Sequence, residues 1–91
     1  MTEQQTQSKI IKDLEKRGAW VVKTIQTNKR GTPDILACLN GQFLAIEVKA
    51  PTGKLSPIQA VQLGRITTCG GISFVAHSFD QYLISIDQLF I

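Results

Sequence analysis

Asp34, Glu47 and Lys49 are the residues of this sequence whose types and spacing fit catalysis. Asp34 is followed by the apolar run 35–39, and Glu47 and Lys49 end the apolar run 43–46. Both runs are typical of buried strands, and a buried charge is costly unless it is paired or bound to a metal. Because side chains alternate along a strand, Glu47 and Lys49 are expected to point to the same face of the sheet.

The turn Asn40-Gly41 would bring the two acids together. An Asn-Gly pair between two apolar runs is a strong signal for a two-residue hairpin, so the strand that starts at Asp34 would lie antiparallel to the strand that ends at Glu47. Two carboxylates on neighbouring strands form an oxygen site suited to Mg²⁺ or Mn²⁺, and the Val48 carbonyl and waters would complete the coordination. Lys49 would lie beside the attacking water.

This arrangement resembles the PD-(D/E)XK nuclease superfamily, written here as Pro33-Asp34 and Glu47-Val48-Lys49. It is most similar to the virus-type replication-repair nuclease (VRR-NUC) family, because further motifs occur in that family's order: Arg30-Gly31-x-Pro33-Asp34-Ile35, Ser56-x-x-Gln59 and Gly70-Gly71. The resemblance covers residues 5 to 84. It implies an endonuclease in which Asp34 and Glu47 bind Mg²⁺ or Mn²⁺ and Lys49 orients water or stabilises the transition state, with a 5′ phosphate left on the product.

Ninety-one residues with 43% hydrophobic content allow one core, so we expect a single domain over residues 1–91. The patterns predict helices over residues 2–17 and 57–69, and strands over residues 19–24, 34–39, 42–49 and 72–76. A strand, long helix and strand in succession favour a parallel final pair. The predicted fold is α/β in the order α-β-β-β-α-β, a mixed sheet flanked by helices with a small C-terminal element, similar to the restriction-endonuclease-like core.

Several apolar residues outside the central strands are expected to be buried. Trp20 is predicted as a core residue of the first strand, and the second helix should bury a stripe made of Ile58, Val61 and Ile66. The two cysteines have no nearby Cys or His partners, so they do not predict a zinc site. They are interpreted as reduced residues in or near the core: Cys38 and Cys69.

The first helix departs from the pattern of the family it resembles. In that family it usually carries a glutamate that helps to hold the metal, and counting back from Gly18 puts this position at or near Gln5. Either Glu3 substitutes from the neighbouring turn, or Gln5 serves as a neutral ligand or orients water. Alternatively, Thr2 and Gln5 form a capping box with no role in catalysis.

The basic residues are distributed in a way that suits DNA. The net charge is only +3, but between residues 23 and 54 the only acids are the two proposed catalytic ones. We expect substrate contacts from the loop residues Lys29, Arg30, Gly31 and Lys54, and from the helix start at Ser56 and Gln59. Alternatively, the loop charges only solubilise the chain, and Ser56 with Gln59 only caps the helix.

The end of the chain leaves alternatives open. His77 follows the last strand and is either a general base, a phosphate contact or a plain strand-end residue. The apolar set over residues 79–91 forms either a homodimer interface or part of the domain's own core. No apolar run approaches the roughly 18 residues needed to cross a bilayer, and no signal peptide is visible, so we expect a soluble intracellular protein, in the host cytoplasm if the protein is viral.

The sequence therefore predicts a Mg²⁺- or Mn²⁺-dependent DNA endonuclease. A homodimer acting on branched DNA, such as a four-way junction in replication or repair, is the expected form, because cutting two strands in concert needs two centres. The alternatives are a DNA-binding module with an impaired site that positions a partner, and a structural cluster in which Lys49 merely neutralises Asp34 and Glu47.

Overall fold

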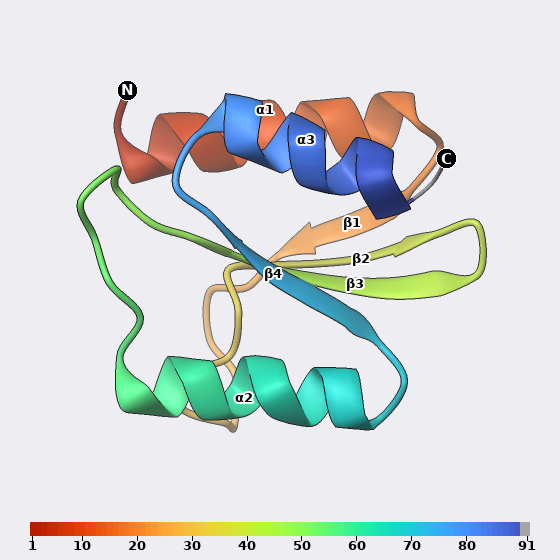
Figure 1. Cartoon of the computed structure of the whole chain (residues 1–91). Coiled ribbons are helices and arrows are strands. Elements are labelled where there is room, and N and C mark those ends of the chain that lie inside the picture. The colour runs from red at the N-terminus through yellow and green to blue at the C-terminus, as the bar shows by residue number, and fades with distance from the viewer. Residues whose placement is uncertain (90–91) are drawn as a thin grey trace.

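A computed structural model describes residues 1–89 of the chain. Figure 1 shows a sheet with helices on both sides. The elements in chain order are α1 (Glu3–Lys16), β1 (Trp20–Lys23), β2 (Ile35–Leu39), β3 (Gln42–Val48), α2 (Pro57–Thr68), β4 (Ile72–Ala76) and α3 (Phe79–Leu89). This order confirms the predicted α/β class, and α3 is the small C-terminal element. Within residues 1–89, none of the helices has both the length and the apolar character needed to span a membrane.

The four strands form one mixed sheet in the order β1-β2-β3-β4. β2 is antiparallel to both β1 and β3, whereas β4 lies parallel to β3, as predicted. The hairpin between β2 and β3 turns at Asn40 and Gly41, whose φ angles are 52° and 78°. Two successive positive φ values are what a type I′ turn requires, and its twist matches that of the flanking strands.

The core lies between the sheet and the pair α1 and α3, which cover one face, while α2 lies on the other (Figure 1). Every second residue of β2 and β3 points to the α1 side, and these residues are almost completely buried: Ile35, Ala37, Leu39, Leu44, Ile46 and Val48. They meet Ile10 and Leu14 of α1 and Tyr82 and Ile86 of α3. This layer therefore buries most of the apolar surface that stabilises the domain.

The face that carries α2 is covered only in part, and several burial predictions were wrong there. Trp20 leaves 68% of its surface exposed, and Ile58 and Val61 are also exposed, whereas Leu63 is the buried residue of α2. Both cysteines are exposed rather than buried: Cys38 and Cys69. The reason is that α2 packs against β4, so the side chains of β1 and β2 that point the same way receive little cover.

The C-terminal apolar set belongs mainly to the core. Tyr82 and Ile86 are buried against α1 and the sheet, and Phe79 and Leu83 pack against the same cluster. These buried positions agree with the alternative that the set closes the domain's own core. Ile84 and Leu89 of the same helix are exposed, so a contact of this set with a second copy stays a prediction. Its last two residues, Phe90 and Ile91, lie outside the described part of the chain.

One hydrogen bond links α1 and α3 across the top of the core. The Tyr82 hydroxyl donates to Asp13 Oδ2 at 2.7 Å, and Arg17 Nε donates to the same oxygen at 2.7 Å. Burial, followed by the bond to Asp13, raises the pKa of Tyr82. The hydroxyl therefore stays protonated and donates at neutral pH.

We expect Tyr82→Phe to lower the free energy of unfolding by about 1.5 kcal/mol, because it removes one hydrogen bond to a charged acceptor and keeps the buried ring. Urea denaturation monitored by circular dichroism measures this change. Ile84→Ala on the exposed side of the same helix is the control and should change stability by less than about 0.5 kcal/mol. Equal effects of the two substitutions would show that this hydrogen bond contributes nothing.

Candidate active site

The hairpin brings Asp34 and Glu47 opposite each other. Ile35 pairs with Ile46, so the next pair along the antiparallel ladder is Asp34 and Glu47, on the face that carries α2. Asp34 Oδ2 accepts a hydrogen bond from the backbone N–H of Val48 at 2.9 Å. The structure therefore places the two predicted acids on neighbouring strands, with the backbone of β3 between them.

The backbone around Asp34 is held from β1. Thr24 follows that strand, and its N–H donates to the Asp34 carbonyl at 2.8 Å. The Thr24 hydroxyl donates to the carbonyl of the buried Pro33, also at 2.8 Å. These two bonds continue the β1–β2 pairing by one residue and fix the point at which Asp34 leaves the loop.

Glu47 is buried, with only 3% of its surface exposed. Its Oε2 atom accepts from Gln59 Nε2 at 3.3 Å and lies 3.7 Å from the ammonium nitrogen of Lys49. Burial, and then the neighbouring Asp34 carboxylate, raise the pKa of Glu47 to about 7, although the Lys49 charge acts in the opposite direction. A cation bound beside Glu47 would stabilise its ionised form, so these surroundings favour cation binding.

Gln59 fulfils both roles weighed from the sequence. Its backbone N–H donates to Ser56 Oγ at 3.3 Å, and its Oε1 accepts from the Ser56 N–H at 2.9 Å, which is a complete capping box. Pro57 occupies the first turn, where its missing N–H costs nothing. The remaining amide group of Gln59 reaches Glu47, so the start of α2 is tied to the acid on β3.

Of the two first-helix candidates, Glu3 is the one that reaches the end of β3. Its Oε2 accepts from the N–H of Ala50, the residue after Lys49, at 3.1 Å. Gln5 forms a capping box with Thr2 instead, as the alternative interpretation proposed. The Gln5 side-chain oxygen accepts from the Thr2 N–H and is thus held away from the role of a ligand.

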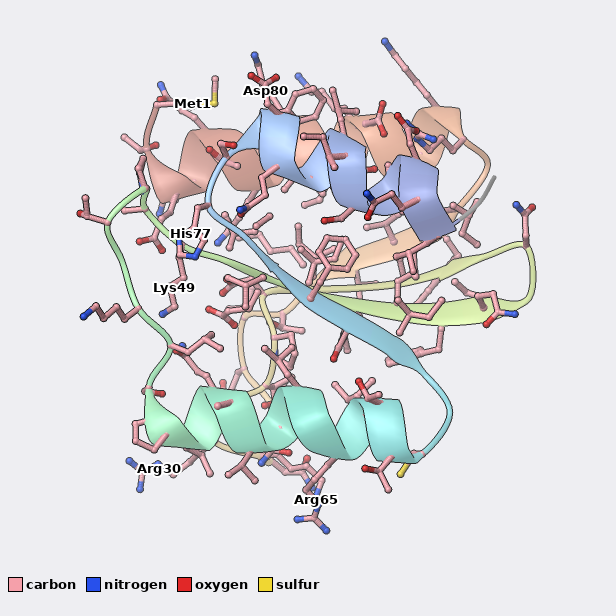
Figure 2. The ribbon with its side chains drawn as sticks, in the orientation of Figure 1. Met1, Arg30, Lys49, Arg65, His77 and Asp80 are labelled. Carbon is pink, nitrogen blue, oxygen red and sulfur yellow. The ribbon has the colours of Figure 1, made fainter. Side chains whose placement is uncertain are left out.

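His77, which follows β4, reaches the same residue, Ala50. Its Nδ1 lies 3.0 Å from the Ala50 carbonyl oxygen, so that nitrogen carries the proton and donates. Figure 2 shows Lys49 and His77 at the same end of the sheet. The backbone of Ala50 is therefore held at its N–H by Glu3 and at its C=O by His77, in two successive peptide groups, which fixes the backbone next to Lys49.

The predicted basic contacts lie on the surface of the domain. Lys29, Arg30 and Lys54 are all exposed, and in Figure 2 Arg30 points outward beside α2, away from Lys49. Gly31 has a φ of 79°, and a Cβ there would lie 2.9 Å from the Ile58 backbone. The close approach that this glycine permits here is to α2, and the contact with a ligand expected from the sequence stays a prediction.

The donor set fits a hard divalent cation. Asp34 and Glu47 supply carboxylate oxygens, and the Glu3 carboxylate of α1 binds the N–H of Ala50, two residues beyond the end of β3. Over residues 1–89, no three His, Cys, Asp or Glu side chains gather closely enough to count as a metal-binding group. Magnesium sites often use one or two carboxylates with waters and phosphate oxygens, so two close acids are compatible with this ion.

Comparison with known proteins agrees with this geometry. The family model described as the VRR-NUC domain matches residues 1–80. The chain belongs to the VRR-NUC family. A solved structure described as a VRR-NUC domain superposes with a TM-score of 0.86 at 29% identity and covers 97% of each chain. This match confirms the nuclease fold predicted from the motifs.

Two further proteins are similar to this VRR-NUC chain. The protein called "Putative nuclease p44" from Acyrthosiphon pisum secondary endosymbiont phage 1 is 32% identical over 72 residues, which are 78% of this chain and 77% of that protein. The Holliday junction resolvase Hjc of Archaeoglobus fulgidus superposes with a TM-score of 0.62 at 25% identity. That match covers 80% of this chain and 65% of the resolvase.

Some residues near the site were missed in the sequence. Gln7 is buried on the inner face of α1, and its Oε1 has no hydrogen-bond partner among residues 1–89. Its burial could have been predicted from its spacing to Ile10 and Leu14, because residues three and seven positions apart share a helix face. The contact between His77 and Ala50 had no such signal, since it joins residues 27 positions apart.

The raised pKa of Glu47 predicts how stability depends on pH in the absence of metal. Between about pH 4.5 and 7 the folded protein keeps a proton on Glu47 that the unfolded chain loses, so stability falls as the pH rises through this window. With a chelator at about pH 8, Glu47→Gln should raise the free energy of unfolding by on the order of 3 kcal/mol.

The difference should vanish near pH 4, where Glu47 is protonated in both states. Urea denaturation at several pH values measures it, and Glu15→Gln on the exposed side of α1 is the matched control. Parallel pH profiles for the parent and Glu47→Gln would show that Glu47 titrates normally.

Proposed function

We propose that this protein is a Mg²⁺- or Mn²⁺-dependent endonuclease that acts on branched DNA as a homodimer. Membership of the VRR-NUC family supports a nuclease. The observation that carries the proposal is the opposition of the half-buried Asp34 and the buried Glu47, with Lys49 Nζ 3.7 Å from Glu47 Oε2. Three charged groups at the edge of a small core cost stability, and phosphodiester hydrolysis accounts for their presence.

Each residue has a role that follows from its contacts. Asp34 and Glu47 would hold the cation, which when bound neutralises charge on the scissile phosphate and activates water. Lys49 carries a positive charge on the same face as Glu47 and would stabilise the negative charge that develops on the phosphate. Gln59 orients the Glu47 carboxylate through its 3.3 Å hydrogen bond and so keeps the acid in place before substrate arrives.

The substrate and the assembly are inferred from likeness and symmetry. The similar protein from Archaeoglobus fulgidus is a Holliday junction resolvase, which supports branched DNA as the substrate. Residues 1–89 contain one pair of opposed acids, so concerted cleavage of two strands would require two copies. A four-way junction has two-fold symmetry, which a homodimer with a two-fold axis would match.

A DNA-binding module with an impaired site is the second candidate. The observation in its favour is that no third acid joins Asp34 and Glu47 to complete a metal-binding group within the described residues. Against it stands Glu3, which is already held at the end of β3. Cleavage assays separate the two candidates, because a binding module would retain DNA affinity and cut nothing in the presence of added metal.

Asp34→Asn and Lys49→Ala should each lower the rate of Mg²⁺-dependent cleavage by at least about a hundredfold, because each removes a charge that acts on the phosphate. The test uses labelled duplex, flap and four-way junction DNA with purified protein. Asp80→Asn, on the exposed first turn of α3, is the matched control and should cut normally. Circular dichroism must show that the variants are folded. Substantial cleavage by Asp34→Asn would refute the assignment.

Glu3→Gln should raise the Mg²⁺ concentration needed for half-maximal cleavage several-fold, because it removes a carboxylate beside the catalytic strand. The matched control is Gln5→Ala, which removes only the capping bond of α1 and should lower stability by about 1 kcal/mol without changing the metal requirement. If the Mg²⁺ requirement rises for Gln5→Ala and stays unchanged for Glu3→Gln, then Gln5 and not Glu3 contributes to the metal site.

A further inference from the structure

A cavity lies beside His77, between the first half of α1 and the start of α3. It has a volume of about 360 Å³, and its polar lining includes Thr6 and Lys9 of α1 together with His77 and Ser78. The two opposed acids do not line it, so it is separate from that pair. We call it the α1–α3 cavity.

Thr6 is the buried polar residue of this cavity, with 4% of its surface exposed. Its backbone N–H donates to the Thr2 carbonyl at 3.0 Å, but its hydroxyl makes no hydrogen bond within residues 1–89. The hydroxyls of Thr67 and Thr68 differ, because each donates to the carbonyl four residues earlier in α2. Over the same residues, the only fully enclosed side-chain oxygen or nitrogen without a partner is Gln7 Oε1. The Thr6 hydroxyl is therefore accessible from the cavity and free to donate to a ligand there.

The first turn of α3 lines the same cavity. Phe79 and Asp80 are the first two residues of this 11-residue helix, and the N–H groups at such positions have no partner within the helix. The Ser78 hydroxyl accepts from the Gln81 N–H at 3.0 Å, so its own proton remains free to be donated. Unpaired N–H groups and the positive end of the helix dipole together favour an anion at this place.

Lys9 supplies a positive charge to the cavity. Its Nζ lies 5.5 Å from the centre of the Phe79 ring, which places the ammonium group at the start of α3. It takes part in none of the ion pairs formed within residues 1–89. Asp80 is the acid in the lining; it is exposed, and Figure 2 shows it on the outer side of α3, away from His77. The inner part of the cavity therefore offers donors and one free cation.

We propose that the α1–α3 cavity binds a backbone phosphate of the DNA strand that is cut, next to the scissile phosphate. This inference rests on the proposed function and assigns that function a second phosphate site. The oxygens of the phosphate accept from the hydroxyls of Thr6 and Ser78, and the Lys9 ammonium group neutralises its charge. Such contacts fix the register of the strand and do not read its sequence.

The position of the cavity suits a neighbouring phosphate. The Lys49 N–H donates at 3.0 Å to the carbonyl of Ala76, the residue before His77, so β3 and β4 carry Lys49 and His77 side by side. Figure 2 shows both side chains at the same end of the sheet. Neighbouring strands of a sheet are about 4.8 Å apart, and consecutive phosphates of one DNA strand are about 3.4 Å apart along the helix axis. A strand with its scissile phosphate at Lys49 therefore brings an adjacent phosphate to His77.

The first test measures DNA affinity without cleavage, by fluorescence anisotropy in a chelator. Lys9→Gln and Thr6→Val should each raise the Kd for labelled DNA about tenfold, because each removes a hydrogen bond to a charged group. Lys9→Gln should also lower the salt slope of log K by about 0.9, whereas Thr6→Val should leave the slope unchanged, since a hydroxyl carries no charge.

Lys16→Gln is the matched control. Lys16 is exposed in the last turn of the same helix, about 10 Å further along its axis than Lys9, so the control should keep the parent's Kd and salt slope. Thr6→Val removes a hydroxyl that has no partner in the free protein, so urea denaturation should show no loss of stability in this variant. A loss of affinity in a variant of unchanged stability cannot come from unfolding.

The second test locates the phosphate on the DNA. A neutral methylphosphonate replaces one phosphate at a time in the cut strand, on both sides of the cleavage point. In the parent, one position next to the scissile phosphate should raise Kd about tenfold. In Lys9→Gln the same replacement should have little further effect, because the contact is already lost. Inorganic phosphate that stabilises the parent to heat, with no sensitive position in the DNA, would assign the cavity to the free anion and overturn the proposal.

The remaining outcomes separate this inference from the proposed function. Equal Kd values for the parent, Lys9→Gln and Thr6→Val would overturn the cavity, as would an equal loss of affinity in Lys16→Gln. With Mg²⁺, Lys9→Gln should raise KM about tenfold and change kcat less than about twofold. Normal cleavage with no sensitive neighbouring phosphate would refute the cavity and leave the nuclease standing. A parent that binds DNA through the cavity and cuts nothing with added metal would refute the nuclease and leave the cavity standing.

Discussion

The fold holds two carboxylates close together at the site, against the burial of one and the repulsion between them. Asp34 and Glu47 face each other across a hairpin, and Glu47 is almost fully buried, so its ionised form is disfavoured until a positive charge compensates it. Lys49 offsets only part of this cost from 3.7 Å. The contacts around the acids keep them close together before substrate binds, so that binding needs no rearrangement.

Four elements supply that constraint at one end of the sheet. The hairpin turn sets the register between β2 and β3, and α2 contributes Gln59 to Glu47. Glu3 of α1 and His77, which follows β4, hold the N–H and the C=O of Ala50. Each contact is a hydrogen bond to a charged group or to backbone, and such bonds fix direction as well as distance. β3 and β4 end together here because they are parallel, which explains how residues far apart in sequence meet.

Local chemistry explains what the sequence could predict. Asn40-Gly41 determined the hairpin, and Ser56, Pro57 and Gln59 determined the start of α2, because each signal acts within four residues. Trp20 was predicted as buried because a strand pattern does not reveal which part of a sheet a helix will cover. The sequence left Glu3 and Gln5 both open as first-helix candidates, because the contact of Glu3 with Ala50 joins residues 47 positions apart. Packing between distant segments therefore accounts for the errors.

The two faces of the sheet contribute differently to the structure. The α1 and α3 face is filled with apolar side chains and supplies stability, whereas α2 buries only Leu63 and depends on specific contacts for its position. Gly31 lets the loop before β2 lie against the Ile58 backbone, and Gln62 Nε2 donates to the Arg30 carbonyl at 3.1 Å. The loop that leads into Asp34 and the helix that carries Gln59 are thus joined as one unit. A side chain at Gly31 would push the loop away from α2. We expect this change to disturb the orientation of the acids more than the packing of the core.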